Sequence, residues 1–309
     1  MKAVDWRAAA EPTVAVPLMM NQAAAQLLSG ECRSIYAAGG TLLRTQWEAG
    51  TAIYPEQIIS LDRIPEMKGI QLTGQGLRVG ASTTLSECEY HSLTAEYAPV
   101  LLEAIRQIAA PSIRNQATIG GNICYGVGDT LPALIAHQAL LTIWEPEGMR
   151  RISVEEWLDR FTGGTRSQAE IIVEIFIPVM DSGLVCGEDE DECGETRMIQ
   201  FFRKIGRREA FTPSLVTVAF RGVLEHGIWR SACCAAAGGA APAVRLNRVE
   251  QVLIGNPYSI KQLGELSRHV LEDYHGFTDV FASADYRCRV AASLLAEGLY
   301  SGMSENEGK

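Results

Sequence analysis

The stretch Ile-Arg-Asn-Gln-Ala-Thr-Ile-Gly-Gly-Asn, residues 113–122, guides the interpretation of the whole 309-residue chain. Two adjacent glycines, Gly120 and Gly121, lie between β-forming residues and a short amide, which is typical of a tight backbone turn. Glycine tolerates positive φ and leaves no Cβ in the way of a ligand. Because successive N–H groups in such a turn can form a concave nest for an anion, we interpret this stretch as a candidate phosphate-binding turn.

A second turn of the same kind lies upstream, where residues 38–41 read Ala-Gly-Gly-Thr. Either glycine pair alone is also explained as a plain tight turn. Both pairs follow an extended run, however, and both are flanked by hydroxyl or amide side chains, namely Thr41, Thr118 and Asn122. Neither fits the glycine spacing of a Rossmann or P-loop site. We predict that the two turns clamp one pyrophosphate.

Composition indicates a globular enzyme of two or three domains, with 47% hydrophobic and 21% charged residues. The net charge of −10 argues against binding to nucleic acid or to an anionic membrane. The N-terminus lacks the apolar core of a signal peptide. The longest apolar run, Leu131–Trp144, is interrupted by polar residues and is shorter than the roughly 18 residues of a membrane span. We therefore expect a cytoplasmic protein.

The chain offers no protein group for covalent or metal chemistry. Its eight cysteines include no C-x-x-C pair, and its five histidines have no metal-ligand spacing, so we assign no metal site. In a reducing compartment the cysteines are expected to be free thiols. No Ser-His-Asp or Cys-His arrangement follows from the spacing, so no catalytic residue is assigned. A cofactor is therefore expected to carry the chemistry.

Periodicity and breaker residues predict two groups of elements. The first group contains helices at 17–29, 85–93, 99–108 and 154–161, a helix that begins near Asp129, and strands at 34–38, 58–61, 70–72, 77–81, 141–144, 151–153 and 170–178. An acidic, glycine-containing run at 181–195 is then interpreted as a solvated loop between domains. From residue 199 onward, long strands (215–221, 228–236) and helices (248–253, 260–274, 282–300) predict a separate α+β domain.

Two further features leave alternatives open. Asp129 is suited to cap the helix that contains Pro132 in its first turn, and its carboxylate is equally suited to accept a hydrogen bond from a sugar hydroxyl. The basic segment 202–208 is either a surface strand whose cations reach the solvent or the source of a cation for a bound cofactor.

These motifs resemble the FAD-binding subunits of molybdenum hydroxylases, the xanthine dehydrogenase and carbon monoxide dehydrogenase group. That family carries Ala-Gly-Gly-Thr in its first loop, Ile-Arg-Asn-x-Ala-Thr-Ile-Gly-Gly-Asn in its second, and then an Asp-x-x-Pro-Ala-Leu helix start, found here at 38–41, 113–122 and 129–134. The similarity continues through 170–178, Arg-Arg-Glu-Ala at 207–210, residues 242–255 and Tyr286-Arg287. The chain looks most like the separate flavin subunit of a bacterial xanthine dehydrogenase.

The resemblance implies an α+β fold with a two-part PCMH-type (vanillyl-alcohol-oxidase-like) FAD-binding domain at residues 1–180. Its two lobes would cover about 1–61 and 62–180, followed by an acidic linker or insert at 181–197. A smaller α+β domain of the carbon monoxide dehydrogenase flavoprotein C-terminal type would cover 198–303, with a tail at 304–309.

The resemblance also assigns a set of FAD-binding residues. Backbone N–H groups of Ala37, Ala38, Gly39, Gly40, Thr41, Leu42 and Leu43, and of Thr118, Ile119, Gly120, Gly121 and Asn122, would hold the pyrophosphate. Asp129 would bind sugar-like hydroxyls, Ile108 would lie against the isoalloxazine ring, and Thr165 and Arg166 would belong to a flavin-contacting loop. Arg203 or Lys204 stands where the family has a lysine near the flavin, and the sequence leaves the choice between them open.

The implied function is electron transfer through FAD to NAD+, with [2Fe-2S] clusters and molybdopterin on partner subunits. The alternatives are a flavin subunit of another molybdenum hydroxylase of the carbon monoxide or aromatic heterocycle type, a stand-alone flavin reductase, and a scaffold that has lost its flavin. Two departures from the family pattern stand out. Leu42 follows Thr41 where Asp is frequent, and the insert at 181–195 has only two cysteines, too few for the additional iron–sulfur cluster of some relatives.

Overall fold

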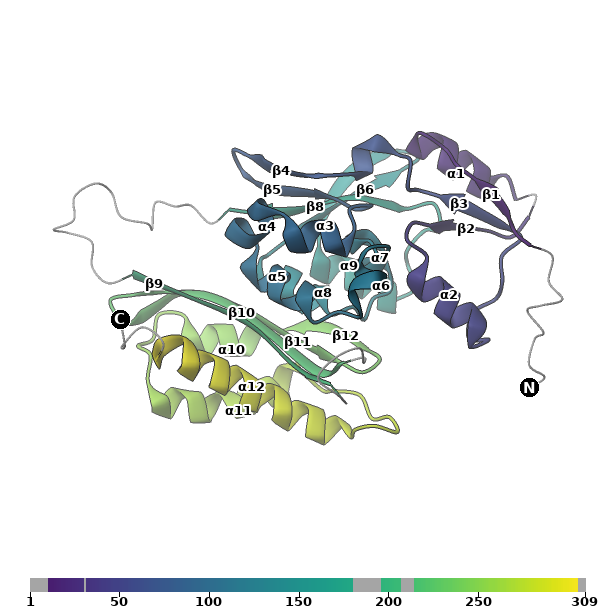
Figure 1. Ribbon diagram of the computed structural model, residues 1–309. Coiled ribbons are helices and arrows are strands. Elements are labelled where there is room, and N and C mark those ends of the chain that lie inside the picture. The colour runs from purple at the N-terminus through teal and green to yellow at the C-terminus, as the bar shows by residue number, and fades with distance from the viewer. Residues whose placement is uncertain (1–10, 31, 180–195, 207–213, 305–309) are drawn as a thin grey trace.

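The computed structural model describes residues 11–30, 32–179, 196–206 and 214–304. Within these ranges the chain forms three sheets, each with its own helices (Figure 1). The acidic run at 181–195, the Arg-Arg-Glu-Ala segment and the tail beyond Ser304 lie outside the described residues. No helix in the described part of the chain has the length and apolar character that a membrane span requires.

The first lobe is a small parallel sheet with two helices. Its strand order is β1-β3-β2, with β1 at Thr13–Ala15, β2 at Ser34–Ala37 and β3 at Gln57–Ser60. The predicted helix at 17–29 is α1, Met20–Leu28, which buries Met20, Ala23 and Ala24. A helix that the sequence did not predict, α2 at Thr41–Glu48, begins directly after the first glycine pair.

The second lobe is an antiparallel sheet with the order β4-β5-β8-β6-β7. Its strands are β4 at Ile70–Thr73, β5 at Gly76–Gly80, β6 at Leu140–Glu145, β7 at Gly148–Ser153 and β8 at Ile171–Pro178. The clearest predicted strand, β8, is central and buried along nearly its whole length, because its side chains are apolar on both faces except for Glu174, which pairs with Arg78.

Helices cover this second sheet, and one of them, α7, carries residues 119–122 of the predicted site (Figure 1). They are α3 (Leu85–Tyr90), α4 (Ser92–Tyr97), α5 (Pro99–Arg106), α6 (Pro111–Arg114), α7 (Ile119–Cys124), α8 (Thr130–Ala136) and α9 (Val154–Thr162), with a 3-10 turn, η2, at Pro65–Met67. The predicted helix at 85–93 is wrong in one detail, because the chain leaves the helical conformation at His91 and α4 then begins anew. Thr84 caps α3 in a capping box with Glu87, as expected from the hydroxyl-rich run before it.

The C-terminal sheet has the order β12-β11-β10-β9, with β9 at Thr196–Gly206, β10 at Ser214–Glu225, β11 at Ile228–Gly238 and β12 at Ala241–Arg245. One face packs on α10 (Asn247–Leu253) and α12 (Ala284–Ser304), which α11 (Ile260–Asp273) covers in turn, and the other face packs on α5 and α8 (Figure 1). Thr196 and Arg197, which were placed in the linker, therefore belong to the first strand of this sheet.

Alternation along β9 sends side chains to two separate cores. Phe201 joins the core with α11 and α12, whereas the neighbouring Phe202 joins the core of the first two lobes. Side chains two residues apart on a strand share a face. Arg203 therefore lies on the side of Phe201, and Lys204 on the side of Phe202.

Candidate functional site

The first glycine pair forms an anion-binding geometry at the start of α2. Gly40 adopts a left-handed conformation with φ of 65° and caps the helix without a side-chain hydrogen bond. Within the described structure, the amides of Gly39, Gly40, Thr41, Leu42 and Leu43 donate no hydrogen bond to the protein. Free amides and the positive end of a helix dipole together favour a bound anion.

The two glycine turns lie in direct contact, as the sequence led us to expect. A Cβ on Gly39 would lie 1.8 Å from the carbonyl oxygen of Gln116 and 3.2 Å from Cα of Ala117. Only a residue without a side chain fits here, because both obstacles are backbone atoms. The close approach fixes the first lobe against the second at the predicted pyrophosphate site.

The second turn differs from the expected nest and needs a correction. Gly120 and Gly121 lie inside α7, and neither has positive φ. Four of the amides expected to hold phosphate already donate within the protein. Ile119 donates to Thr83 O at 3.0 Å, Gly120 to Ala81 O at 2.8 Å, Gly121 to Thr118 Oγ1 at 3.1 Å and Asn122 to Thr118 O at 3.0 Å. The prediction that these four amides form an anion-binding nest is therefore wrong.

The glycines of the second turn serve close packing instead. A Cβ on Gly120 would lie 2.7 Å from Cβ of Ala81, closer than real Cβ atoms come, whereas one on Gly121 would meet only Thr118 Oγ1, at 3.0 Å. The donors that remain for a ligand are the Thr118 amide, for which the described structure gives no acceptor, and two side chains. The Thr118 hydroxyl accepts from Gly121 and keeps its own proton to donate. Asn122 accepts from Thr130 through Oδ1 at 2.7 Å, which leaves its amide nitrogen as a donor.

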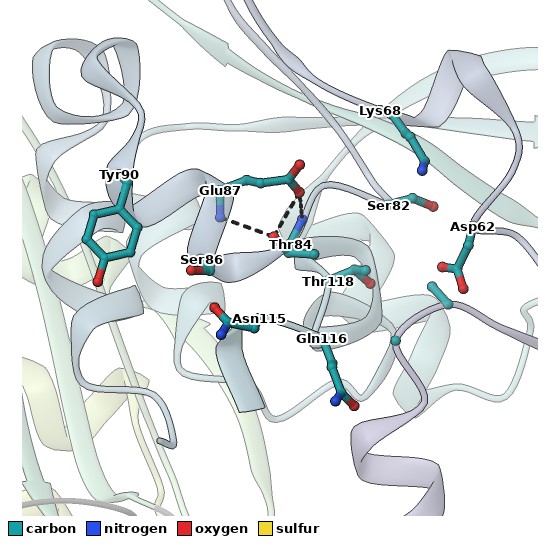
Figure 2. Close-up of a pocket in the computed structure, with 12 residues that line it drawn as sticks. Asp62, Lys68, Ser82, Thr84, Ser86, Glu87, Tyr90, Asn115, Gln116 and Thr118 are labelled. Carbon is teal, nitrogen blue, oxygen red and sulfur yellow. Dashed lines mark hydrogen bonds between the residues drawn. The ribbon is translucent and has the colours of Figure 1, made fainter. Parts of the chain in front are cut away.

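A cavity of about 800 Å³ opens beside the contact between the two turns (Figure 2). Of the residues assigned from the sequence, Ala38, Gly39 and Thr118 line it. The other lining residues are Asp62, Lys68, Ser82, Thr84, Ser86, Glu87, Tyr90, Asn115 and Gln116. Sequence reasoning missed Lys68 and Ser82, since neither lies in a motif. Ser82 is 6% exposed, and its hydroxyl oxygen has no partner among the described residues.

Asp129, Lys204 and Ser214 meet where the C-terminal sheet reaches α8. Asp129 occupies the capping position of α8 but makes no side-chain cap, so the structure contradicts the capping role, one of the two that the sequence left open. Its Oδ2 lies 2.6 Å from Nζ of Lys204, and its Oδ1 accepts from the Ser214 hydroxyl at 2.7 Å. Lys204 also donates to the Gln107 carbonyl at 2.8 Å. Both oxygens of the carboxylate are thus held by the C-terminal domain.

The structure separates the two cations between which the sequence left a choice. The guanidinium of Arg203 lies 2.8 Å from Glu297 on α12 and stacks over the ring of Phe201. That contact is on the far side of the sheet from Asp129. Lys204 is therefore the cation that the fold places beside the predicted site, and Arg203 is not.

The remaining assigned residues lie at two places. Ile108 follows the end of α5 and is half-buried against the main core. Arg166 lies over the rings of Trp157 and Phe161, with its guanidinium carbon 4.3 Å and 4.8 Å from the ring centroids, while Thr165 is exposed. Phe161 in turn packs against Gly126, whose φ is 79°. The Thr165–Arg166 loop therefore adjoins the segment that joins Asn122 to Asp129.

No cluster of histidine, cysteine or acidic side chains suited to a metal ion occurs among the described residues. The six cysteines within those residues are all free. Burial raises the pKa of Cys88 to about 12 and also raises the pKa of Cys234, so both remain neutral thiols at neutral pH.

Comparison with known proteins matches both parts of the chain to families. Residues 10–180 match the FAD binding domain in molybdopterin dehydrogenase, and residues 200–301 match the CO dehydrogenase flavoprotein C-terminal domain. The chain belongs to the FAD-binding subunits of the molybdenum hydroxylase family.

Individual relatives agree with this placement. The xanthine dehydrogenase FAD-binding subunit of Escherichia coli O157:H7 is 27% identical over 290 residues, which cover 93% of this chain and 94% of that protein. The carbon monoxide dehydrogenase medium chain of Hydrogenophaga pseudoflava is 36% identical over 135 residues, 42% of this chain and 46% of that one. The solved structure of carbon monoxide dehydrogenase from Hydrogenophaga pseudoflava superposes with a TM-score of 0.84 at 22% identity and covers 96% of this chain and 98% of that one.

Proposed function

We propose that this chain is the flavin subunit of a xanthine dehydrogenase-like complex and that NAD+ is the acceptor of its electrons. Its partners would be an iron–sulfur subunit and a molybdopterin subunit, in the cytoplasm. The observation that carries the proposal is the backbone contact between Gly39 and Gln116, because it joins the free amides of α2 to the Thr118 hydroxyl. The similarity to the Escherichia coli subunit over 93% of this chain supports xanthine as the substrate class.

The described residues fit FAD at both ends of this site. The start of α2 offers unpaired amides to a diphosphate, and Lys204, held by Asp129, offers a positive charge. When bound, FAD would exchange single electrons with iron–sulfur clusters and a hydride with NAD+, so the protein needs no nucleophile or general acid.

The protein's own residues then have three tasks. The α2 amides bind the diphosphate, Asp129 holds Lys204 in place, and Ile108 presents an apolar surface that excludes water from one face of the ring. Lys204 is held by Asp129 and by the Gln107 carbonyl, so its charge stays at one position rather than sampling many rotamers.

A second candidate is the flavin subunit of a carbon monoxide or heterocycle hydroxylase. The higher identity to the Hydrogenophaga pseudoflava medium chain, 36% over 42% of this chain, favours it. The two candidates share the same flavin chemistry and differ in the substrate of the molybdopterin subunit.

The test is to isolate the chain with its natural partners under mild conditions and identify every polypeptide by mass spectrometry. We expect an iron–sulfur and a molybdopterin subunit, one FAD in each copy of this chain, and anaerobic bleaching of the flavin by NADH. Bleaching by xanthine, but not by carbon monoxide or N-heterocycles without a purine ring, would select the first candidate. A partner-free flavoenzyme with its own substrate, or a colourless chain that rejects added FAD, would overturn the proposal.

A further inference from the structure

A buried arginine supports the loop that carries Ile108. The side chain of Arg114, on α6, is 8% exposed, and its Nη1 donates to the carbonyls of Ile108 and Ala109, each at 2.9 Å. Its Nε donates to Glu89 Oε2 at 2.8 Å, and the Glu89 side chain is itself only 11% exposed. Arg114 is thus held by a carboxylate on one side and holds a backbone loop on the other.

The backbone at this loop is in a conformation that needs such support. Ala109 has φ of 44°, in the left-handed region that is unfavourable for a residue with a Cβ. This conformation turns two successive carbonyls, those of Ile108 and Ala109, toward one nitrogen. Because the loop also ends α5, these carbonyls lie at the negative end of a helix, where a cation is favourable.

A second cation, from the other domain, binds the same helix end. Lys204 on β9 donates to the carbonyl of Gln107, the residue that terminates α5. One turn earlier on α5, Glu103 accepts from the amide of Phe202, two residues before Lys204 on the strand. The end of α5 is therefore clamped between Arg114 from within its own domain and Lys204 from the C-terminal sheet.

A buried ion pair is weak evidence for stability, because apolar side chains of similar size often stabilise a core as well. A geometric role accounts better for this pair, since an apolar side chain could not bind the two carbonyls. Without Arg114, the left-handed turn at Ala109 would relax, and the Gln107 carbonyl that anchors Lys204 would move with it.

We propose that Arg114, oriented by Glu89, is a positioning residue for the flavin site. It fixes the Gln107–Ala109 backbone, and through that backbone it fixes both Ile108 and the ammonium group of Lys204. The inference rests on the proposed function in one respect, that FAD lies against Ile108 and Lys204.

The test compares Arg114→Lys and Glu89→Gln with a matched control, Arg78→Lys, in the chain as it is normally assembled. Arg78 is also part-buried, pairs with Glu174 and donates to the carbonyl of Glu66 at 2.9 Å, but it lies on β5 away from α5. The readouts are FAD content, visible circular dichroism of the bound FAD, and its two-electron midpoint potential. Glu89→Gln keeps the size of the side chain and serves if Arg114→Lys fails to fold.

We expect Arg114→Lys and Glu89→Gln to retain FAD, to change its visible circular dichroism, and to lower its potential. A tenfold weaker preference for reduced over oxidised FAD corresponds to ~30 mV for a two-electron couple. Arg78→Lys should leave both spectrum and potential unchanged. Folded, FAD-loaded Arg114 and Glu89 variants with the spectrum and potential of the unmodified protein would overturn the inference.

A double-mutant cycle in FAD-free protein separates this inference from the proposed function. If Arg114 holds Lys204 in place, Lys204→Met should shift the unfolding midpoint less in an Arg114→Lys background than in the unmodified chain. Additive shifts would overturn the positioning role even if the chain binds FAD. A chain that never binds FAD, yet shows this coupling, would overturn the proposed function and leave the link between Arg114 and Lys204 intact.

Discussion

The ammonium nitrogen of Lys204 lies 2.6 Å from the Asp129 carboxylate, although the two residues are 75 positions apart in the chain. The contact joins β9 of the C-terminal domain to the start of α8 in the FAD-binding domain. Both side chains are largely shielded from solvent, at 10% and 12% exposure. This pair fixes where the two domains meet, and it does so beside the residues proposed to face the flavin.

Removal of Lys204 is expected to destabilise the chain more than removal of its neighbour. Lys204→Met leaves a shielded carboxylate with only Ser214 to compensate it, a loss of about 3 kcal/mol in free energy of unfolding. Arg203→Met, the matched control, breaks a pair whose members are 33% and 52% exposed, so about 0–1 kcal/mol is expected. Urea denaturation of FAD-free protein measures both, and equal losses would contradict the distinct placement of the two cations.

Gly39→Ala tests the contact between the two turns. The new Cβ would meet the Gln116 carbonyl at 1.8 Å, so the lobes must separate, at a cost of about 1–3 kcal/mol. We expect the variant to lose both stability and FAD. The FAD content is measured as the ratio of the flavin absorbance near 450 nm to the protein concentration. Gly74→Ala is the control, because nothing lies within 4 Å of its added Cβ. Full FAD content in Gly39→Ala would refute the role assigned to this contact.

The two glycines of the second turn are expected to respond differently. Gly120→Ala drives a methyl group into Ala81 and should lower the unfolding midpoint by several degrees. Gly121→Ala needs only a shift of a few tenths of an ångström at Thr118, and alanine favours the helical conformation found there. Its stability should stay near that of the unmodified chain. If Gly121→Ala is stable but cannot retain FAD, the absence of a side chain at residue 121 is needed for FAD binding and not for folding.

The buried imidazole of His137 is expected to make the free energy of unfolding fall below neutral pH. This residue is 1% exposed, and burial together with the nearby Arg221 lowers its pKa to about 3. The unfolded chain binds a proton near pH 6.5 and the folded chain does not, so stability is complete above pH 6.5 and declines as the pH falls. The loss should reach about 2 kcal/mol at pH 5.

Denaturation at pH 5 and pH 8 measures this effect, with His137→Leu as the test variant. Both ring nitrogens lack partners in the described structure, so leucine breaks no hydrogen bond there. The variant should lose ~2 kcal/mol less than the unmodified chain between the two pH values. His226→Asn, on the exposed turn between β10 and β11, controls for general effects of histidine loss. An unchanged pH dependence in His137→Leu would rule out this origin.

Local patterns were sufficient to predict much of the fold. The apolar β-branched run of β8 and the amphipathic helix α11 carry their periodicity within a few residues, and both lie where the sequence placed them. The sequence did not predict the helices α2 and α7. The first begins directly after a glycine pair and the second contains one, and glycine has a low intrinsic helix propensity. One glycine of each pair is required by a distant segment, Gly39 by Gln116 and Gly120 by Ala81, and sequence spacing does not reveal these contacts.

The site residues, like the elements of the fold, include some that local sequence predicts and others that depend on distant contacts. The sequence motifs were sufficient to identify the two turns and Asp129, because turn residues and the resemblance to the family can be recognised within a few consecutive residues. The choice between Lys204 and Arg203 needed the register of β9 against β10, in which Lys204 pairs with Thr217 and Arg203 with Val218. The role of Arg114 was also hidden, since the left-handed backbone of Ala109 that it supports has no sequence signature.

None of the eight residues of α2 is buried in the described structure, and Trp47 on this helix touches the edge of Tyr54 at 5.1 Å between ring centroids. On the proposed function, the coenzyme itself supplies the missing packing partner for this helix. A newly made chain would then complete its folding only when enough FAD, which is made from riboflavin, is available. Chains made under riboflavin limitation should then be cut by proteases around residues 41–56, and assembly of the proposed complex would depend on the supply of coenzyme.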